Sequence, residues 1–536
     1  MNDRFPRVSD WARRACSESG LWDGRLLDGY LEEFARSSPD RLAVVDGATR
    51  LSYADLLDQV SRISAGLRQL GVGPGDVVAM QLPNWWEALA VHYAVLRLGA
   101  VSNPVMPILR ERDLAYVLSR GGAKVLVSAA EYRGFDHGAL GVLLAGQLPD
   151  LAHVVTVRGS RDGALDFAEL TATADGGAAQ PGRTADDPVV LLYTSGTEAR
   201  PKGAVHSHNT LGYENRTMIE LFRLTAEDVM WAPSPIAHIT GVLYAFHLGC
   251  MLGSPVVLQD VWNAEDGLDL IEAERCSFVV AATPFLHGIT YSPELAQTDV
   301  SSLRIFVCGG ADVPPGLIRD ADRLLGVRAM RLYGSTEIPT LTSSSAEAPL
   351  ELRSTTDGRA IADAEVRIVD DDGREVAPGT PGRLIARGAE AMLGYLDVPA
   401  QPFDHEGWLD TGDLGRMDGD GYVQIVGRRK DIILRGGENI SAKEVEDLLY
   451  GHPDIADVAV VAYPDPRLTE RACAVVVPRP GTTVDLASIV AFLDTQSVAR
   501  QKFPERIEIV DELPKTPTGK IQKFRLRQLV AERSVG

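Results

Sequence analysis

The sequence predicts an α/β protein with a large N-terminal domain and a small α+β C-terminal domain. Three observations support this prediction. The chain has 536 residues, which exceeds a single typical domain. Over the first two thirds, short apolar runs alternate with helical segments, as in a mostly parallel sheet covered by helices. From Thr355 onward, alternating runs are separated by Asp/Gly turns, which indicates antiparallel strands and a β-barrel-like part.

The N-terminal elements follow from local patterns. Residues 28–70 are helical at both ends, with a strand–turn–strand at 42–52 around Asp46-Gly47. Ser52 is an N-cap and Asp55 lies near the capping-box position. Further elements are strands at 77–82 and 124–128, a helix from about Trp85 to Leu98, a Gly/Pro-rich loop at 173–187, and strands at 188–193, 255–259, 277–281 and 304–307.

The later elements belong to two different units. Strands at 365–369 and 382–387 lie in the antiparallel part. The tail has helices at 442–450 and 486–496 and strands at 456–462, 472–477 and 506–510. The predicted division is therefore 1–429 and 430–536, with a hinge near Lys430.

Composition and charge exclude several classes of protein. A net charge of −21 argues against non-specific electrostatic binding to nucleic acid or to an anionic membrane. The apolar run 241–258 contains His247 and Pro255, which predicts a core helix and a strand and no membrane span. Five scattered cysteines without zinc spacing, and an N-terminus without an apolar segment, predict a cytoplasmic protein.

A hydroxyl-rich loop follows the strand at 188–193. Its candidate phosphate-binding residues are Thr194, Ser195, Gly196, Thr197 and Lys202. Glycine lets backbone N–H groups approach phosphate oxygens, hydroxyls donate hydrogen bonds, and lysine adds charge. The loop is not a Walker A motif, because the lysine follows a proline and no Ser/Thr follows it. The alternative is an ordinary polar surface loop.

Other candidate residues have equally plain alternatives when taken singly. Glu337 ends the segment Arg331-Leu-Tyr-Gly-Ser-Thr-Glu and could hold Mg²⁺ through one carboxylate, or be a surface glutamate. Asp413 could accept ribose hydroxyl protons, or be a turn aspartate. Lys520, in the loop Pro514–Lys520, would normally be solvated.

Together with the segments 427–439 and 514–522, these motifs resemble the adenylate-forming superfamily of acyl-CoA synthetases, acid-adenylating enzymes and beetle luciferases. The resemblance covers about residues 28–527. The departure is Glu198-Ala199, where the family more often has Thr-Gly. The segments 82–87 and 100–112 look like cyclohexanecarboxylate–CoA ligases and similar medium-chain acyl-CoA ligases.

The resemblance implies a role for each matching residue. Thr194 to Thr197 and Lys202 would wrap the β- and γ-phosphates of ATP, and Glu337 would bind Mg²⁺ beside Thr336. The remaining nucleotide residues would be Gly310, Ala311 and Asp312 around adenine, Tyr333 stacked on it, Gly334 and Ser335 next to it, and Asp413 with Arg428 at the ribose.

The implied chemistry has two steps. A carboxylate attacks the α-phosphorus of ATP, giving acyl-AMP and pyrophosphate, and Lys520 stabilises the added charge. A thiol then attacks acyl-AMP after the small domain rotates about Lys430. Gly436 and Gly437 would leave room for the pantetheine arm of coenzyme A.

The segment Pro235–Tyr244 resembles the border of the acyl pocket, with His238 as gate or wall; otherwise His238 is a core histidine. No aspartate lies in this segment to pair with an ammonium, so a neutral apolar acid is expected.

The expected acceptor is coenzyme A, with a carrier protein or an amine as alternatives. Leu434 argues against a luciferase-like oxygenase, because those enzymes place a second lysine there. Lys520 and the hinge argue against an ATP-sensing binding module. The oligomeric state, a homodimer included, stays open.

Overall fold

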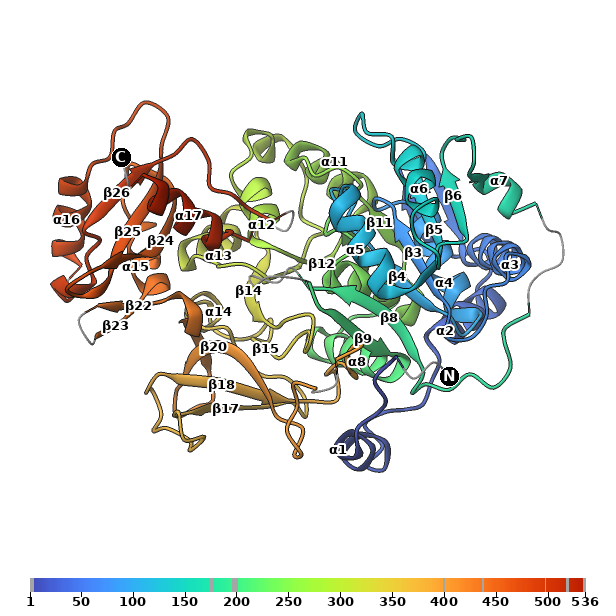
Figure 1. Ribbon diagram of the computed structural model, residues 1–536, viewed down its shortest axis with the longest axis horizontal. Coiled ribbons are helices and arrows are strands. Elements are labelled where there is room, and N and C mark those ends of the chain that lie inside the picture. The colour runs from blue at the N-terminus through green and yellow to red at the C-terminus, as the bar shows by residue number, and fades with distance from the viewer. Residues whose placement is uncertain are drawn as a thin grey trace.

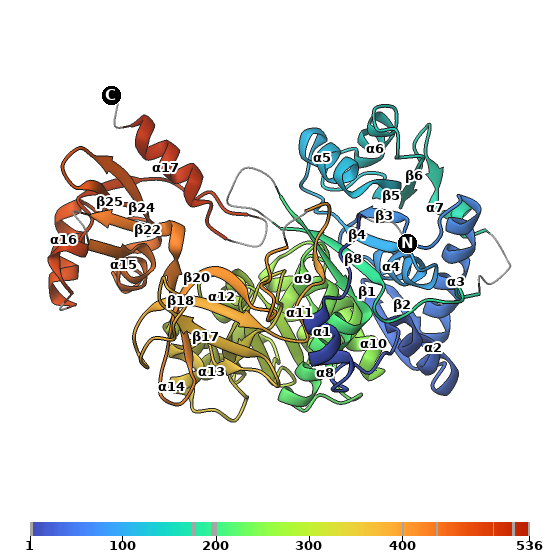
Figure 2. The same ribbon diagram turned by 60° about the horizontal axis from the view of Figure 1, so that its bottom comes forward.

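The computed structural model describes residues 4–172, 178–194, 201–398, 401–435, 438–496, 498–516 and 520–533. Two large mixed sheets form most of the N-terminal domain, and the C-terminal domain lies at one end of the molecule (Figure 1). The same separation is seen in Figure 2, where the C-terminal domain protrudes from the rest. The predicted two-domain α/β fold is confirmed.

The first sheet has eight described strands. Most neighbours are parallel, and β8–β9 and β9–β19 are antiparallel. In spatial order they are β19 (Gly394–Tyr395), β9 (Gly203–Ser207), β8 (Pro188–Tyr193), β4 (Val101–Pro104), β3 (Val77–Gln81), β5 (Ala123–Ala129), β6 (His153–Val157) and β7 (Leu165–Asp166). The predicted strands at 77–82, 124–128 and 188–193 are all present.

The second sheet has nine described strands and a parallel centre. In spatial order they are β16 (Arg359–Ala360), β15 (Thr342–Ser343), β14 (Arg328–Tyr333), β13 (Ile305–Cys308), β12 (Phe278–Ala281), β10 (Met230–Ala232), β11 (Val256–Leu258), β1 (Leu42–Asp46) and β2 (Thr49–Ser52). The hairpin β1–β2 confirms the predicted turn at Asp46-Gly47.

Helices fill the space between the two sheets and cover their outer faces. The inner layer contains α3 (Tyr53–Gln69), which begins with the Ser52–Asp55 capping box, and α4 (Trp86–Arg97), which is buried along nearly its whole length. Its other members are α2 (Leu27–Ser37), α8 (His208–Phe222), α9 (Ile239–Gly241), the π-helix η2 (Val242–His247) and α10 (Leu248–Leu252). One hydrophobic core joins this layer to both sheets. A helix that is apolar all round is stable only in such a position.

The outer layers are separate cores. The eight-stranded sheet is covered by α5 (Glu111–Gly121) and α6 (His137–Ala145), and the nine-stranded sheet by α11 (Ala264–Glu274), α12 (Thr283–Thr290) and α13 (Pro315–Leu324). The remaining helices are short: α1 (Asp10–Ala12), the π-helix η1 (Arg13–Ser17), α7 (Phe167–Leu170), η3 (Pro293–Gln297) and α14 (Leu350–Thr355).

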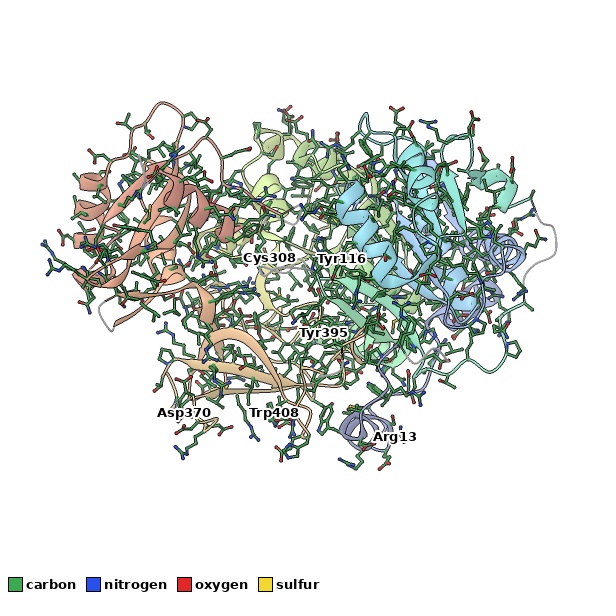
Figure 3. The ribbon with its side chains drawn as sticks, viewed as in Figure 1. Arg13, Tyr116, Cys308, Asp370, Tyr395 and Trp408 are labelled. Atoms are coloured by element: carbon green, nitrogen blue, oxygen red, sulfur yellow. The ribbon has the colours of Figure 1, made fainter. Side chains whose placement is uncertain are left out.

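The predicted barrel-like part is a four-stranded antiparallel sheet. Its described strands run in the order β17 (Glu365–Val369), β18 (Gly382–Arg387), β20 (Leu409–Met417) and β21 (Val423–Arg428). This sheet lies along the lower edge of the view in Figure 3, where Asp370 and Trp408 are labelled. Its last strand leads through η4 (Arg429–Asp431) into the C-terminal domain.

The C-terminal domain is a small α+β unit, as predicted. Its sheet consists of β22 (Ile432–Arg435), β23 (Glu438–Ser441), β24 (Ile455–Asp465), β25 (Thr469–Pro478) and β26 (Arg506–Ile509). Its helical segments are α15 (Ala442–Leu449), α16 (Leu486–Thr495), η5 (Arg500–Lys502) and α17 (Lys523–Glu532). Among the described residues of the whole chain, no helix is long and apolar enough to cross a membrane.

Candidate active site

A cavity of about 1010 Å³ lies between the two domains. Residues that the sequence singled out contribute to its wall from both sides. Nine of them line it: Gly310, Ala311, Asp312, Tyr333, Gly334, Asp413, Arg428, Lys430 and Lys520. These residues come from the ends of β13, β14 and β21, from β20, from η4, and from the loop before α17. They are distant in sequence, and the fold brings them together.

Asp413 is the centre of one group in this cavity. It lies directly opposite Arg428 in the antiparallel pair β20–β21, and Arg428 Nε is 2.8 Å from Asp413 Oδ1. The Tyr333 hydroxyl donates a hydrogen bond of 2.7 Å to Asp413 Oδ2. A carboxylate offers about four acceptor positions, so Asp413 can still accept ribose hydroxyl protons. The predicted ribose and adenine residues therefore form one hydrogen-bonded unit.

The loop after Tyr333 turns sharply, and the turn requires a glycine. A Cβ at Gly334 would lie 1.2 Å from the Pro339 carbonyl oxygen, which excludes every other residue. Ser335 stabilises the same turn, because its Oγ accepts hydrogen bonds from the Glu337 and Ile338 backbone N–H groups. The turn carries Thr336 and Glu337 away from the interdomain cavity, which neither of them lines.

Lys520 enters the cavity from the C-terminal domain. Its backbone is anchored by Thr516, whose N–H donates to the Lys520 carbonyl oxygen at 2.8 Å and whose Oγ1 accepts from the Lys520 N–H at 3.1 Å. Burial lowers the pKa of the Lys520 ammonium to about 8, and repulsion by Arg428 and Lys430 adds to this effect. The structure thus has the domain arrangement in which Lys520 lines the same cavity as the predicted nucleotide-binding residues Tyr333, Asp413 and Arg428.

Lys443, at the start of α15, is a cavity residue that the sequence gave no reason to choose. Its ammonium forms an ion pair with Asp312 of the N-terminal domain and a second one with Asp447, at 2.9 Å. Burial and repulsion by Asp312 raise the pKa of Asp447 to about 7. Asp312 was predicted only as an adenine neighbour, and it also ties the two domains together.

A second group of predicted residues lies within the N-terminal domain. The Tyr395 hydroxyl donates a hydrogen bond of 2.6 Å to Glu337 Oε1, and the Lys202 ammonium lies 5.1 Å from the centroid of the Tyr395 ring. The backbone carbonyl of Thr336 is 2.8 Å from His206 Nε2. Burial lowers the pKa of His206 to about 4, so its ring is neutral and donates through Nε2.

Of the predicted phosphate-binding loop, the structure describes only the two ends, Thr194 and residues 201–202. Thr194 N–H donates to the Lys202 carbonyl oxygen at 2.9 Å, which extends the pairing of β8 and β9. Lys202 itself is exposed. Ser195, Gly196 and Thr197, like Gly436 and Gly437 of the predicted pantetheine path, lie outside the described residues.

Glu337 fits the expected Mg²⁺ ligand. Its side chain is half-buried, and within the described part of the chain its Oε2 makes no hydrogen bond. In the same part, no group of three or more His, Cys, Asp or Glu side chains is arranged to hold a metal. One carboxylate, with phosphate oxygens and water completing the shell, is how Mg²⁺ usually binds next to a nucleotide.

His238 lies at the start of α9, directly before the π-helix η2, and does not line the interdomain cavity. Its Nε2 is buried and has no hydrogen-bond partner among the described residues. Burial lowers its pKa to about 4, so the ring is neutral.

A buried hydrogen-bond network connects the His238 segment to the Glu337 loop. The Tyr244 hydroxyl, from η2, donates to Glu214 Oε1 at 2.6 Å and lies 2.7 Å from Thr340 Oγ1. Burial raises the pKa of Glu214 to about 7. This network was not predicted from the sequence. Its only sequence signals are a glutamate in α8, Glu214, and a polar residue three places after Glu337, Thr340, and neither is enough to predict that the two side chains meet.

Comparison with known proteins shows the family to which this chain belongs. The model of the AMP-binding enzyme family matches residues 31–396, and the model of the AMP-binding enzyme C-terminal domain matches residues 444–520. The chain therefore belongs to the AMP-binding enzyme family, the adenylate-forming ligases that its motifs resemble. It is an acid–thiol ligase of the AMP-forming kind, as predicted.

Individual relatives extend over nearly the whole chain. A medium-chain fatty-acid–CoA ligase of Escherichia coli (strain K12) is 37% identical over 528 residues, covering 97% of this chain and 93% of the relative. A salicyl-AMP ligase / salicyl-S-ArCP synthetase of Mycobacterium tuberculosis is 34% identical over 532 residues, covering 97% and 94%. The crystal structure of ATP-bound MatB from Rhodopseudomonas palustris superposes with a TM-score of 0.85 at 28% identity, covering 94% of this chain and 99% of that one.

Proposed function

We propose that this protein is an ATP-dependent carboxylic acid–CoA ligase that acts on an apolar acid of medium size. The observation that carries the proposal is the interdomain cavity, in which Lys520 of one domain faces Tyr333, Asp413 and Arg428 of the other. Such a composite site suits a reaction in which a nucleotide is held by one domain and attacked under control of the other.

In the first half-reaction, the acid carboxylate displaces pyrophosphate from the α-phosphorus of ATP. The Asp413 carboxylate binds the ribose hydroxyls, and Arg428 holds Asp413 in place. Tyr333 and the Gly310–Asp312 segment line the adenine pocket. Lys520 donates hydrogen bonds to the oxygens that gain charge in the transition state, so its ammonium must be protonated.

The phosphates beyond the α-position are assigned to the second group. Thr194 and Lys202 flank the loop that would receive them, and Ser195, Gly196 and Thr197 complete it in our proposal. Glu337 would hold Mg²⁺, which when bound neutralises charge on the phosphate oxygens. Thr336 stands beside it, and its backbone is held by neutral His206.

In the second half-reaction, a thiol attacks the acyl-AMP carbonyl and AMP leaves. In the present arrangement Lys520 lies against the nucleotide group, so the C-terminal domain must turn before a thiol can enter. We place the domain division at 429/430 and the hinge at Lys430, in the one-turn helix η4. Arg435, before Gly436-Gly437, is now paired with Glu505 inside its own domain and would turn toward the site.

The class of acid is inferred from the segment Pro235–Tyr244, which includes His238 and resembles the border of the acyl pocket. No carboxylate lies between Pro235 and Tyr244 to pair with a substrate ammonium, and His238 is neutral. An apolar acid is therefore favoured over an α-amino acid. The name of the Escherichia coli relative supports a medium-chain fatty acid, and that of the Mycobacterium tuberculosis relative an aryl acid.

The alternative is transfer of the acyl group to a carrier-protein thiol. It is favoured by the salicyl-S-ArCP synthetase activity named for one relative. An amine acceptor is a further alternative. A cytoplasmic location is part of the proposal and is supported by the five cysteines, which are all buried and free.

The test is acid-dependent pyrophosphate release, measured first across a panel of fatty, cyclic and aryl acids. The best acid is then offered CoA, a carrier protein or an amine, and the thioester or amide is quantified by mass spectrometry. We expect pyrophosphate release with apolar acids of medium size and a thioester with CoA. Pyrophosphate release only with amino acids, or product only with an amine, would contradict the proposal.

A further inference from the structure

Tyr395 occupies a position between two parts of the candidate site that the sequence did not connect. It lies in β19, a two-residue strand that pairs with β9 so that Tyr395 is opposite Ala204, two residues after Lys202. Figure 3 shows Tyr395 well inside the N-terminal domain, away from the C-terminal domain. Its place therefore does not depend on which way the C-terminal domain is turned.

The Tyr395 side chain contacts two residues with predicted binding roles, Glu337 through its hydroxyl and Lys202 through its ring. Its hydroxyl donates the 2.6 Å hydrogen bond to Glu337 Oε1, and its ring face receives the Lys202 ammonium at 5.1 Å from the centroid. A hydrogen bond to an ionised acceptor is short and strong, and an ammonium within about 6 Å of an aromatic face is attracted to it.

The backbone around Tyr395 is held rigidly. The Gln401 side chain accepts a hydrogen bond from Tyr395 N–H at 2.7 Å and donates one to its carbonyl oxygen at 3.1 Å. Tyr395 is only 9% exposed and packs with Ala204 and Met392.

The residues that flank β19 also hold the backbone of the loop that carries Glu337 and of the loop that carries Lys202. Met392 N–H donates to the Glu337 carbonyl oxygen at 2.8 Å, and Leu396 N–H donates to the Gly203 carbonyl oxygen at 2.8 Å. One short segment therefore positions the loop that carries Glu337 and the end of the loop that carries Lys202. Tyr395 is its only side chain known to contact both functional groups within the described residues.

We propose that Tyr395 is a positioning residue. Its hydroxyl orients the Glu337 carboxylate to bind Mg²⁺, and its ring holds the Lys202 ammonium where it can contact the phosphates. Because the hydroxyl occupies Oε1, the other oxygen of Glu337 is directed to a cation. Because the ring separates the ammonium from the carboxylate, the two opposite charges do not neutralise each other by direct pairing. The inference rests on the proposed function, which assigns Glu337 and Lys202 their ligands.

The main test is Tyr395→Phe, which keeps the ring, its packing and the Lys202 contact and removes only the hydroxyl. ATP binding is measured by isothermal titration calorimetry without acid or CoA, over a series of Mg²⁺ concentrations. We expect the Mg²⁺ concentration for half-maximal enhancement of ATP binding to rise about tenfold, the loss expected for one hydrogen bond to a charged group. In steady-state assays the KM for the magnesium nucleotide should rise while the KM for the acid stays unchanged.

The controls separate positioning from a general loss of structure. Tyr132→Phe removes a hydroxyl that donates to the Asp260 carbonyl oxygen, outside the site, and should leave the Mg²⁺ requirement unchanged. Glu337→Gln should raise the Mg²⁺ requirement, and adding Tyr395→Phe to it should have no further effect, since coupled residues are not additive. Tyr395→Leu should also weaken ATP binding in the absence of Mg²⁺, because the Lys202 ammonium loses its contact with the aromatic ring.

Each outcome has a defined meaning. If Tyr395→Phe has the wild-type Mg²⁺ requirement while Glu337→Gln does not, the positioning role is wrong and the proposed function stands. If the wild-type protein shows no Mg²⁺-dependent ATP binding, the proposed function fails with it. If Tyr395→Phe lowers Tm and weakens acid and nucleotide binding equally, the residue is structural and the proposal is overturned.

Discussion

The two halves of the candidate site are built in different ways. The half that we propose binds magnesium and pyrophosphate, with Glu337, Tyr395 and Lys202, lies within one domain and is held by strand pairing between β9 and β19. The nucleotide half is completed across a domain boundary, where Lys520 and Lys443 meet Asp413 and Asp312. The contacts of the first half are all made within the N-terminal domain, whereas Lys520 and Lys443 reach the second half only in this domain arrangement.

In the function that we propose, this difference would let one active site serve two chemically incompatible steps. Groups that bind ATP throughout the cycle belong on the rigid side, and the lysine needed for one step belongs on the part that moves. Variants on the two sides should therefore affect the half-reactions differently.

Lys520→Ala is expected to have the largest effect. Removing a donor aimed at the transition state costs about 10²–10³-fold in rate, so acyl-AMP formation should fall by about that factor. Thioester formation from supplied acyl-AMP should be retained. Isotope exchange between pyrophosphate and ATP measures the first step, and CoA thioester yield the second. Equal loss in both would remove the distinction between the fixed and moving halves.

Asp413→Asn is expected to weaken nucleotide binding in both half-reactions. Its carboxylate accepts from Tyr333 and pairs with Arg428, and an amide can satisfy only part of this arrangement. The KM for ATP, and the KM for acyl-AMP in the second step, should each rise about tenfold or more, the effect of losing a charged hydrogen bond. An increase confined to the first step would contradict this prediction, because it would mean that Asp413 binds the nucleotide only while Lys520 is in the site.

The pH dependence of the first step should report Lys520. Its folded-state pKa is lowered to about 8, and catalysis needs the protonated form, so kcat/KM for ATP should decline as pH rises through about 8. The kcat limb should lie at higher pH, because bound ATP stabilises the ammonium. Lys520→Arg, whose guanidinium stays charged, should lose the alkaline decline even if its rate is low. A decline that persists in this variant would assign it to another group.

Lys443→Met should have the smallest effect. It removes the ion pairs with Asp312 and Asp447 while an unbranched side chain is kept, and it leaves the two carboxylates facing each other, so the domains should separate more readily. The acyl-AMP step should slow about three- to fivefold, in the range of one partly exposed ion pair, while the thioester step is unchanged or faster. Small-angle scattering and limited proteolysis near Lys430 would detect the shift. Asp312→Asn serves as the matched variant from the other domain.

Much of the fold was predictable because its signals are local. The buried strands β3 and β8 are continuous apolar runs, and the capping box before α3 lies within four residues of sequence. Short strands such as β4 and β19 carry no such signal, because pairing with a distant strand makes them strands. The barrel-like expectation was refined to a four-stranded sheet for the same reason: strand alternation does not specify closure.

The candidate site also has a part that local sequence motifs predicted and a part that depends on contacts between distant residues. The sequence by itself determined the family and predicted Lys520 as the catalytic lysine and Tyr333, Asp413 and Arg428 as nucleotide-binding residues, because all of them lie in short motifs. Only the tertiary structure decided that Tyr395 joins Glu337 to Lys202 and that Lys443 reaches Asp312. Those contacts connect residues 58 to 193 positions apart, and no local preference of the chain encodes a contact at that separation.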